Sequence, residues 1–414
     1  MNKKSDLGQI FSLTVLVASL GYFVDMFDLL LFPILRQSSL AALGIVGPAQ
    51  IDVYRNLLNA QMVGMLLGGI FWGMLGDKRG RLSTLFGSIT LYSLANIANA
   101  FVHSTSAYMV WRFVAGLGLA GELGAAVTLV SEILPRHLRG YGTTIVAAVG
   151  IFGTVAATLV GKYFPWRMGY LAGGGLGLLL LLLRIGLRES GLFKDMHSSN
   201  VSRGDFLSLF TNAERLGRYL RCILIGLPTW FVVGILINLA PEFAPKLGVT
   251  GPVQAGTAVA FTYSGITLGS FGSGFLSQIW GTRKKVVGLF ISATLAGVVF
   301  YLTVRGLSPA MFYILALYLG LATGYWAVFV TIGAEQFGTN LRSTVATTVP
   351  NFVRGAVPLI TSSFVFLKAP LGFVGSAAVV GAVCFTLALG SLVGLRETHG
   401  LDMDYLEGEP GAAR

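Results

Sequence analysis

The sequence predicts an all-α membrane protein in which twelve transmembrane helices form two pseudo-symmetric six-helix bundles. Three observations predict this fold class: the composition, a series of long apolar segments, and an internal repeat. Of the 414 residues, 54% are hydrophobic and only 11% are charged, and the mean hydropathy is +0.74. A soluble protein carries about 25% charged residues. The chain therefore has too few polar side chains to cover a surface in water, and we expect it to lie in a lipid bilayer.

The apolar segments each approach the roughly 20 residues that a helix needs to cross a bilayer. They are 10–35, 53–76, 82–102, 107–131, 142–163, 167–187, 218–243, 253–280, 285–304, 309–333, 344–367 and 371–395. The 55 glycines fit this assignment, because small residues allow membrane helices to pack closely.

Lysines and arginines gather in alternate loops, with basic clusters at 78–81 and 283–285. Because basic loops stay on the cytoplasmic side of a membrane, we expect these loops and both termini to be cytoplasmic in a multi-pass inner (plasma) membrane protein. The net charge of +11 follows from this topology, so no nucleic-acid partner is needed to explain it.

Three stretches of the first half return in the second half at nearly the same spacing. "GMLGDKRGR" (73–81) returns as "GFLSQIWGTRKK" (274–285), "SEILPRHLRG" (131–140) as "AEQFGTNLRS" (334–343), and "LRES" (187–190) as "LRET" (395–398). The predicted organisation is a first bundle at 1–187, a cytoplasmic linker at 188–217, a second bundle at 218–395 and a cytoplasmic tail at 396–414. Transporters built from such repeats bind substrate near the midplane between the halves.

These stretches resemble the major facilitator superfamily over essentially the whole chain. The 73–81 loop matches its signature loop, and "RFVAGLGLAGELGAAVTLVSEILPRHLRG" resembles both sugar porters and metabolite–proton symporters. "RESGLF" and "EQFGTNLRST" are similar to the metabolite–proton symporters, which carry organic acids and zwitterions, and "VDMFD" resembles the acidic motif of the aromatic-acid–proton symporters. The resemblance implies a secondary transporter that works by alternating access, and not an enzyme.

The signature loop and its neighbours predict a cytoplasmic gate. Carboxylates and cations at the ends of helices can pair when this side is closed and separate when it opens, which makes a two-state latch. The expected gate residues are Gly73, Asp77, Arg81, Glu132, Arg139, Glu335 and Arg342. The alternative is that these charges only set the membrane topology.

Asp25 and Asp28 stand three residues apart in the first apolar segment, on one helix face. A charge at the bilayer centre costs at least ~2.5–3.5 kcal/mol, so we expect them to be functional. Asp28 and Arg112 both lie about 8–10 Å below the outer ends of their helices, so a pair is possible. Sugar porters place an acid on helix 1 and an arginine on helix 4 at matching positions. The resemblance therefore implies that Asp28 and Arg112 form a proton-coupling pair. The alternative is a static ion pair. Glu122 is either a second proton site or an anchor for its helix.

Arg354 lies near the middle of the eleventh segment and needs an anion. A carboxylate substrate would suit it, since arginine binds carboxylates with two parallel hydrogen bonds. The resemblance to organic-anion carriers also implies a functional arginine on this helix. Alternatively, Arg354 pairs with Asp25, which we expect to face the same cavity, or with Glu122. Further pocket candidates, each of which can equally well only bond a neighbouring helix, are Asn59, Gln61, Asn238, Tyr263, Tyr325 and Trp326.

The leading expectation is a monomeric, proton-coupled importer of a small organic anion such as a carboxylate, with the proton as coupling ion and no cofactor or metal site. Asp28 would carry the proton, Arg112 would tune it, and Arg354 would hold the anion. The alternatives are a symporter of a zwitterion or a sugar, an exporter or exchanger of the same fold, and a nutrient sensor that does not transport. A sensor of that kind usually carries a long cytosolic tail, and the segment 396–414 is short.

Overall fold

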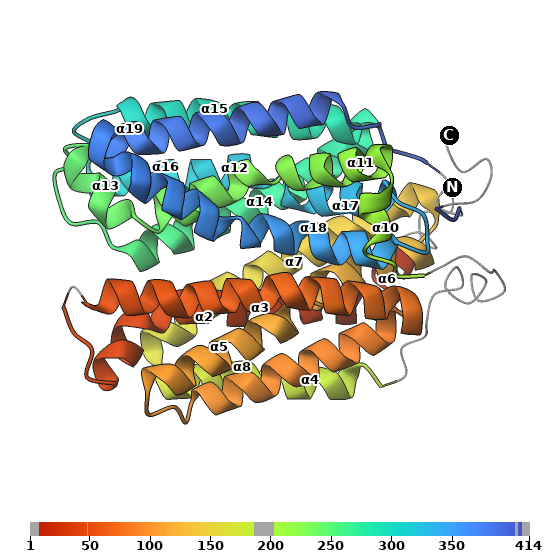
Figure 1. The fold of residues 1–414 in the computed structure, drawn as a ribbon, viewed down its shortest axis with the longest axis horizontal. Coiled ribbons are helices and arrows are strands. Elements are labelled where there is room, and N and C mark those ends of the chain that lie inside the picture. The colour runs from red at the N-terminus through yellow and green to blue at the C-terminus, as the bar shows by residue number, and fades with distance from the viewer. Residues whose placement is uncertain (1–7, 48, 186–202, 402–404, 408–414) are drawn as a thin grey trace.

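A computed structural model describes residues 8–47, 49–185, 203–401 and 405–407 of the chain. Within these ranges the secondary structure is helical, and no strand occurs. The helices lie roughly side by side along the long axis of the molecule (Figure 1). The predicted all-α class is confirmed.

The helices of the first half correspond to the first six predicted segments. They are α2 (Leu13–Ala42), α3 (Ala49–Arg79), α4 (Arg81–Asn99), α5 (Thr105–Leu119), α6 (Glu122–Ile133), α7 (Arg136–Tyr163) and α8 (Trp166–Leu183). One predicted segment, 107–131, is divided into α5 and α6 at Ala120 and Gly121. The break falls in a glycine-rich stretch, and glycine lowers helix stability by roughly 0.5–1 kcal/mol relative to alanine.

The second half shows more interruptions. Its helices are α10 (Ser208–Thr211), α11 (Ala213–Leu224), α12 (Leu227–Phe231), the π-helix η1 (Val232–Ile237), α13 (Ala240–Lys246), α14 (Ala255–Trp280), α15 (Arg283–Thr303), α16 (Pro309–Thr323), α17 (Trp326–Glu335), α18 (Arg342–Gly355) and α19 (Val357–Val393). α19 bends sharply at Gly372, whose φ of 70° is a left-handed conformation that glycine adopts at little cost. This bend separates the last two predicted segments.

Each predicted segment overlaps one helix or a consecutive run of helices in the described ranges. Nine helical spans there are long and apolar enough to cross a membrane, and one of them, Arg342–Val393, holds two predicted segments. α4 and α14 fall short of that criterion because serine, threonine, asparagine and glycine replace much of their apolar surface. The predicted linker differs in extent, because α11 already begins at Ala213. Residues 188–202 of the linker lie outside the described residues, as do the whole of the "LRES" and "RESGLF" stretches and part of the tail.

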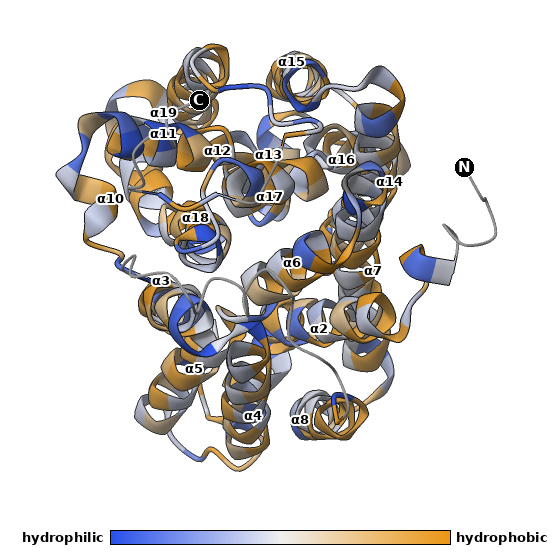
Figure 2. Cartoon of the chain, turned by 90° about the vertical axis from the view of Figure 1, so that its right-hand side faces the viewer, coloured by the Kyte–Doolittle hydropathy of each residue, from blue (hydrophilic) through white to orange (hydrophobic). Residues whose placement is uncertain are grey.

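The two halves form two bundles that meet mainly along two helix pairs, α3 with α18 and α7 with α14, and α6 also packs against α18. Figure 2, which looks along the helices, shows these four helices between the bundles. The internal packing repeats as well: α4 packs against α5 and α8, and α15 packs in the same way against α16 and α19. The sequence repeat is therefore a structural repeat.

Two ends of the molecule are distinguished below. The basic end contains the turns after α3, α6, α14 and α17, and the opposite end contains the turns after α2, α4, α7 and α15. Between them, many large apolar side chains are exposed on the outer helix faces, for example Phe71, Leu179 and Phe366. Such a surface is suited to contact with lipid chains and not with water.

Candidate substrate-binding and proton-coupling site

Arg354 of α18 lies between the two bundles and is 1% exposed. Its guanidinium donates hydrogen bonds to Asn351 Oδ1 (3.3 Å) and to the Tyr22 hydroxyl of the first bundle (3.4 Å). The rings of Trp326 and Trp230 lie 5.6 and 6.0 Å from it, within the range of a cation–π interaction. No carboxylate lies within 4 Å of this guanidinium in the described part of the chain. The anticipated pairs of Arg354 with Asp25 or Glu122 do not form.

A small cavity of about 20 Å³ adjoins Arg354. Its lining is mostly aromatic and apolar, and comprises Tyr22, Met26, Ile151, Thr229, Trp230, Val233, Tyr263, Ile266, Trp326 and Arg354. The space holds about one water molecule, so a larger molecule enters only if the surrounding helices separate. The Trp326 indole donates a hydrogen bond to the Tyr22 hydroxyl (3.2 Å) and joins the bundles here.

The acidic pair of α2 does not line this cavity, although the Arg354 charge acts electrostatically on Asp25. Asp25 and Asp28 are fully buried and do not line it, so the expectation that Asp25 faces the same cavity as Arg354 is wrong. The reason is helix geometry: at 3.6 residues per turn, Tyr22 and Met26 occupy a different face from Asp25 and Asp28. Among the described residues neither carboxyl forms a hydrogen bond within 3.5 Å, and the Asn96 side chain lies near Asp28.

Arg112 of α5 is also fully buried, but it does not contact Asp28. It donates a hydrogen bond to Gln61 of α3, and its guanidinium lies 4.9 Å from the Phe32 ring. Asp28 instead lies against Gly173 of α8, where a Cβ atom would collide with its carboxyl oxygen. Asp28 and Arg112 are close enough to interact electrostatically. They do not form an ion pair within 4 Å in this conformation.

Glu122, the first residue of α6, forms an ion pair with Arg184. Both side chains are fully buried, and Ser88 of α4 donates a further hydrogen bond to the same carboxylate (3.4 Å). Arg184 also donates to the carbonyl of Leu85. The sequence places Arg184 at a helix end, where it looks like a topology signal; its burial could not be read from the sequence.

The remaining pocket candidates separate into two groups. Tyr263 and Trp326 line the cavity. Gln61 accepts from Arg112, the Tyr325 hydroxyl donates to the Ile225 carbonyl inside the second bundle, and Asn59 and Asn238 are half-buried outside the cavity lining. The sequence reasoning missed Tyr22, Met26 and Trp230. The first two could have been found, because they stand four residues apart beside the acidic face of the same helix.

At the basic end, the predicted gate residues of both bundles meet in one network. Arg81 binds Glu132 (2.7 Å) and lies 3.4 Å from Asp77. Glu132 also binds Arg342 of the second bundle (3.1 Å). The Asp77 carboxylate accepts hydrogen bonds from the backbone N–H groups of Ser343 (3.0 Å) and Thr344 (2.8 Å) at the start of α18. A carboxylate is favourable there, because the N-terminus of a helix carries partial positive charge and free N–H groups.

The other predicted gate residues have different roles. Gly73 allows close contact, since a Cβ atom there would lie 2.8 Å from the Cα of Thr344. Arg139 donates to the Ser131 carbonyl (2.7 Å). Glu335 binds Arg283 (3.1 Å) inside the second bundle. This ion pair corresponds, in the second half, to the Arg81–Glu132 pair of the first half. The sequence did not predict it.

The start of α15 is capped by Glu397, which follows the last helix. Its carboxylate accepts hydrogen bonds from the Thr282 hydroxyl and from the backbone N–H groups of Arg283 (2.8 Å) and Lys284 (3.2 Å). Burial by itself raises the pKa of Glu397, but these hydrogen bonds outweigh it, and the pKa lies below its usual value.

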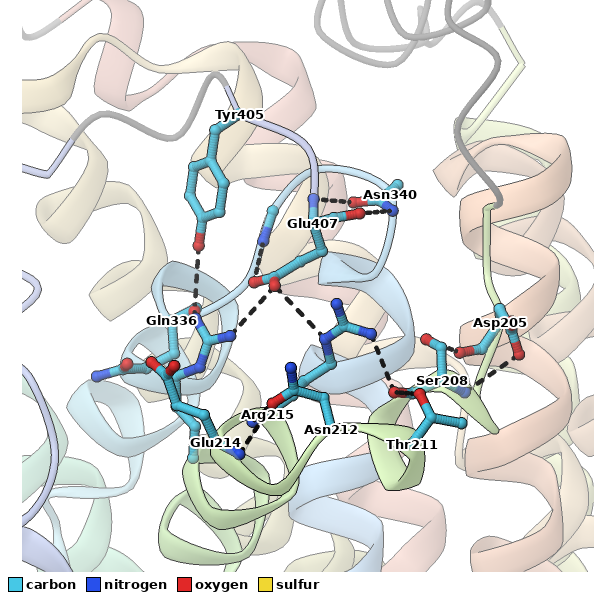
Figure 3. A network of polar contacts seen from close by, with 12 residues as sticks. Asp205, Ser208, Thr211, Asn212, Glu214, Arg215, Gln336, Asn340, Tyr405 and Glu407 are labelled. Carbon is cyan, nitrogen blue, oxygen red and sulfur yellow. Dashed lines mark hydrogen bonds and ion pairs between the residues drawn. The ribbon is translucent and has the colours of Figure 1, made fainter. Parts of the chain in front are cut away.

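A short C-terminal strap, Tyr405–Glu407, lies on the loop between α17 and α18 (Figure 3). The Glu407 backbone N–H donates to Asn340 (2.8 Å), and its carboxylate accepts from Arg218 of α11 (3.2 Å). The Tyr405 carbonyl accepts from the Thr339 N–H (2.9 Å). Because the Thr339 carbonyl accepts from Arg81 (3.1 Å), the strap is connected to the gate network.

The opposite end is open by comparison. A cleft of about 670 Å³ separates the bundles there. It is lined by α2 residues between Pro33 and Leu40, by Gly47 and Gln50, and by Pro241, Glu242 and Val253–Gly256 of the second bundle. The structure is thus closed at the basic end, nearly closed around Arg354, and open at the opposite end.

The chain belongs to the major facilitator superfamily, whose family model matches residues 11–362. It is a multi-pass membrane transporter and not an enzyme. The fold is shared with the proton:xylose symporter XylE, in a structure with bound 6-bromo-6-deoxy-D-glucose (TM-score 0.74, 16% identity, 96% of this chain and 98% of that chain). It is also shared with FucP in its outward conformation (TM-score 0.75, 16% identity, 93% and 99%).

Several relatives carry names of aromatic acid transporters. The niacin transporter NiaP of Acinetobacter baylyi is 28% identical over 69% of this chain and 72% of its own length. The gentisate transporter of Corynebacterium glutamicum is 25% identical (81% and 78%). The 4-hydroxybenzoate transporter PcaK of Pseudomonas putida is 25% identical (63% and 66%).

Proposed function

We propose that this protein imports a small aromatic carboxylate together with protons by alternating access. The observation that carries the proposal is Arg354: a buried guanidinium without a carboxylate within 4 Å, set between tryptophan rings beside a cavity at the bundle interface. An anionic group would pair with Arg354, and an aromatic ring would pack among Tyr22, Trp230 and Trp326. The names of the relatives support an aromatic acid.

Asp28 carries the coupling proton in this proposal, and Arg112 tunes its release. The support is that Asp28 is fully buried and forms no ion pair among the described residues, a situation that disfavours the charged form by several kcal/mol. The bundles at 1–187 and 218–395 move against each other, with 188–217 as linker and 396–414 as tail. The protein acts as a monomer in the inner (plasma) membrane, with the basic end and both termini in the cytoplasm, and needs no cofactor.

The test is substrate binding to purified Arg354 variants. Nicotinate and 4-hydroxybenzoate are titrated against the parent, Arg354→Gln and Arg354→Lys. Charged hydrogen bonds contribute about 1.5–3 kcal/mol, so we expect the Gln variant to raise the Kd of the acid at least about 10-fold, and the Lys variant to keep part of the affinity.

The neutral analogue nicotinamide serves as a control for the charge, and Arg305→Gln, at an exposed site of the opposite end, as a control for the substitution. Equal binding of acids to the parent and to Arg354→Gln would contradict the anion role. Binding of sugars or zwitterions in preference to both acids would replace the substrate class.

A further inference from the structure

We infer that the coupling proton travels inside the first bundle, along a file of polar groups from Asp28 past Asp25 and Tyr92 to the Glu122–Arg184 pair, separate from the substrate path between the bundles. The inference rests on the proposed function, because it presumes a proton-coupled carboxylate transporter. Beyond the proposed function, the inference assigns a role to Tyr92 and Arg184. It also gives the order in which the proton passes Asp28, Asp25 and Glu122.

The two paths use two faces of α2. Tyr22 and Met26 contact Arg354 at the bundle interface. Gly21, Asp25 and Asp28 follow the i, i+4, i+7 spacing of one helix face and point into the first bundle. There a Cβ on Gly21 would collide with Glu122 and Arg184, and one on Gly173 with Asp28. The substrate side and the proton side of α2 are therefore neighbouring faces, with Asp25 next to their border, since Arg354 still acts on it electrostatically.

α4 supplies the facing side of the file. Ser88, Tyr92 and Asn96 follow one another at four-residue spacing and are all fully buried. Ser88 binds Glu122 (3.4 Å) and Asn96 lies near Asp28, whereas the Tyr92 hydroxyl has no hydrogen-bond partner among the described residues. Tyr92 stands one helical turn from Ser88, which binds Glu122, and it interacts electrostatically with Glu122, Arg184, Asp28 and Asp25.

The lower part of the file approaches the basic end. Arg184 follows the last residue of α8 and donates a hydrogen bond to the Leu85 carbonyl. Leu85 lies four residues, or about 6 Å, along α4 from Arg81 of the gate. Glu122 pairs with Arg184 there, and in this inference it receives a proton when that pair separates. Arg184 stays charged throughout.

Each transfer along the file balances. The O–H bond of protonated Asp28 breaks, and an O–H bond forms on the acceptor; Asp28 becomes a carboxylate and the next carboxylate becomes an acid. Tyr92 and ordered water relay the proton, since buried polar groups without a protein partner are commonly satisfied by water. The last proton passes from Glu122 to the solvent of the basic end, and Glu122 pairs with Arg184 again.

The groups that face this route come from every neighbouring helix. Asp28 is faced by Arg112 of α5, Asn96 of α4 and Tyr170 of α8. Asp25 is faced by Arg354 of α18, Glu122 of α6 and Tyr92 of α4. Any of these charges can shift the pH at which the route operates, and the Glu122–Arg184 pair lies between the two aspartates and the basic end.

The test separates proton movement from substrate movement in proteoliposomes loaded with purified protein. One assay follows exchange of radiolabelled nicotinate and 4-hydroxybenzoate at equal pH on both sides; the other follows accumulation driven by an imposed pH gradient. For Tyr92→Phe and Glu122→Gln we expect exchange within twofold of the parent and pH-driven accumulation reduced at least tenfold. Tyr301→Phe, a buried tyrosine bonded to Leu236 in the second bundle, and Glu214→Gln, at an exposed pair, should lower neither rate.

Retention of pH-driven accumulation by both route variants would overturn the inference, as would an equal loss of exchange and accumulation in a folded variant. Removing Glu122 leaves Arg184 buried and unpaired, which can prevent folding, so Tyr92→Phe, which deletes only a hydroxyl, decides in that case. If the parent itself neither exchanges the two acids nor responds to the gradient, the proposed function fails, and the inference fails with it.

Discussion

Arg112 and Arg354 are two guanidinium groups inside the membrane-spanning region, and each is surrounded by aromatic rings instead of carboxylates. Phe32 and Tyr170 flank the first, and Trp230 and Trp326 flank the second. Cation–π contacts contribute up to about 2 kcal/mol when desolvated, which offsets only part of the cost of burying a charge. The proposed function gives each of them an anion during transport: the substrate at Arg354, and the carboxylate form of Asp28 near Arg112.

Asp28→Asn tests this arrangement at the residue scale. Asparagine has nearly the same shape and cannot release a proton, so we expect accumulation driven by a pH gradient to fall at least tenfold while exchange of substrate persists. Uptake and exchange in proteoliposomes measure the two quantities. Asp52→Asn, at an exposed ion pair of the opposite end, is the matched control. Full pH-driven accumulation by Asp28→Asn would rule out its role as proton carrier.

At the scale of single helices, the chain caps helix N-termini with carboxylates from distant segments. Asp77 of α3 caps α18 across the bundle interface, and Glu397 caps α15 within the second bundle. The same chemistry has different consequences. The Glu397 cap joins two segments of one bundle and adds stability, whereas the Asp77 cap joins the two bundles and must break when the basic end opens.

Glu397→Gln should therefore lower stability in a pH-dependent manner. The pKa of Glu397 in the folded protein lies below the usual value of about 4.3. The contribution of Glu397 to the free energy of unfolding is therefore fully present above that usual value. It is lost as the pH falls through the lower pKa that Glu397 has in the folded protein. We expect the variant to be less stable than the parent at pH 7 by on the order of 1 kcal/mol, as for other N-cap losses.

The measurement is thermal unfolding of the purified protein at pH 7 and at pH 3.5. The difference between parent and variant should shrink at the lower pH. A difference that stays constant or grows on acidification would contradict the assigned sign. Glu214→Gln, whose carboxylate is exposed, controls for the loss of one negative charge.

At the scale of the whole molecule, the contacts between the bundles are distributed unevenly. The basic end holds the Glu132–Arg342 pair and the Asp77 cap, the centre holds the Tyr22–Trp326 hydrogen bond, and the opposite end holds a cleft of about 670 Å³. This conformation accepts a molecule from the opposite end. Passage to the basic end requires that the gate network breaks while the cleft closes.

Gly73→Leu should shift this balance. A side chain at residue 73 collides with the backbone of Thr344, so closure of the basic end becomes unfavourable and open conformations gain population. The readout is labelling of Thr347→Cys, a buried site of α18 at the interface, in a background without Cys222 and Cys384. We expect labelling at least fivefold faster with Gly73→Leu than without it.

Gly272→Leu is the matched control, because a Cβ atom there meets no atom within 4 Å. It should leave the labelling rate unchanged. Equal labelling in the Gly73→Leu and Gly272→Leu proteins would contradict the role of Gly73 in closing the basic end.

The sequence by itself determined the membrane class, the repeated halves and the identity of the charged residues. Hydrophobic length and repeat spacing are local properties, so the helices match the predicted segments closely. The same holds for the gate: Asp77, Arg81, Glu132 and Arg342 are brought together as their motif predicted, because each stands at a helix end whose position follows from topology.

Only the tertiary structure decided which buried charges meet. Periodicity assigns a residue to a face of its helix, but the helix that packs against that face is set by the fold of the bundle. Hence Asp25 forms no ion pair with Arg354 in the described structure, Glu122 binds Arg184 instead of a residue of the other half, and Arg112 binds Gln61. Few charged or polar groups lie inside a membrane protein. A small rotation of one helix can therefore exchange the partner of a buried charge on that helix.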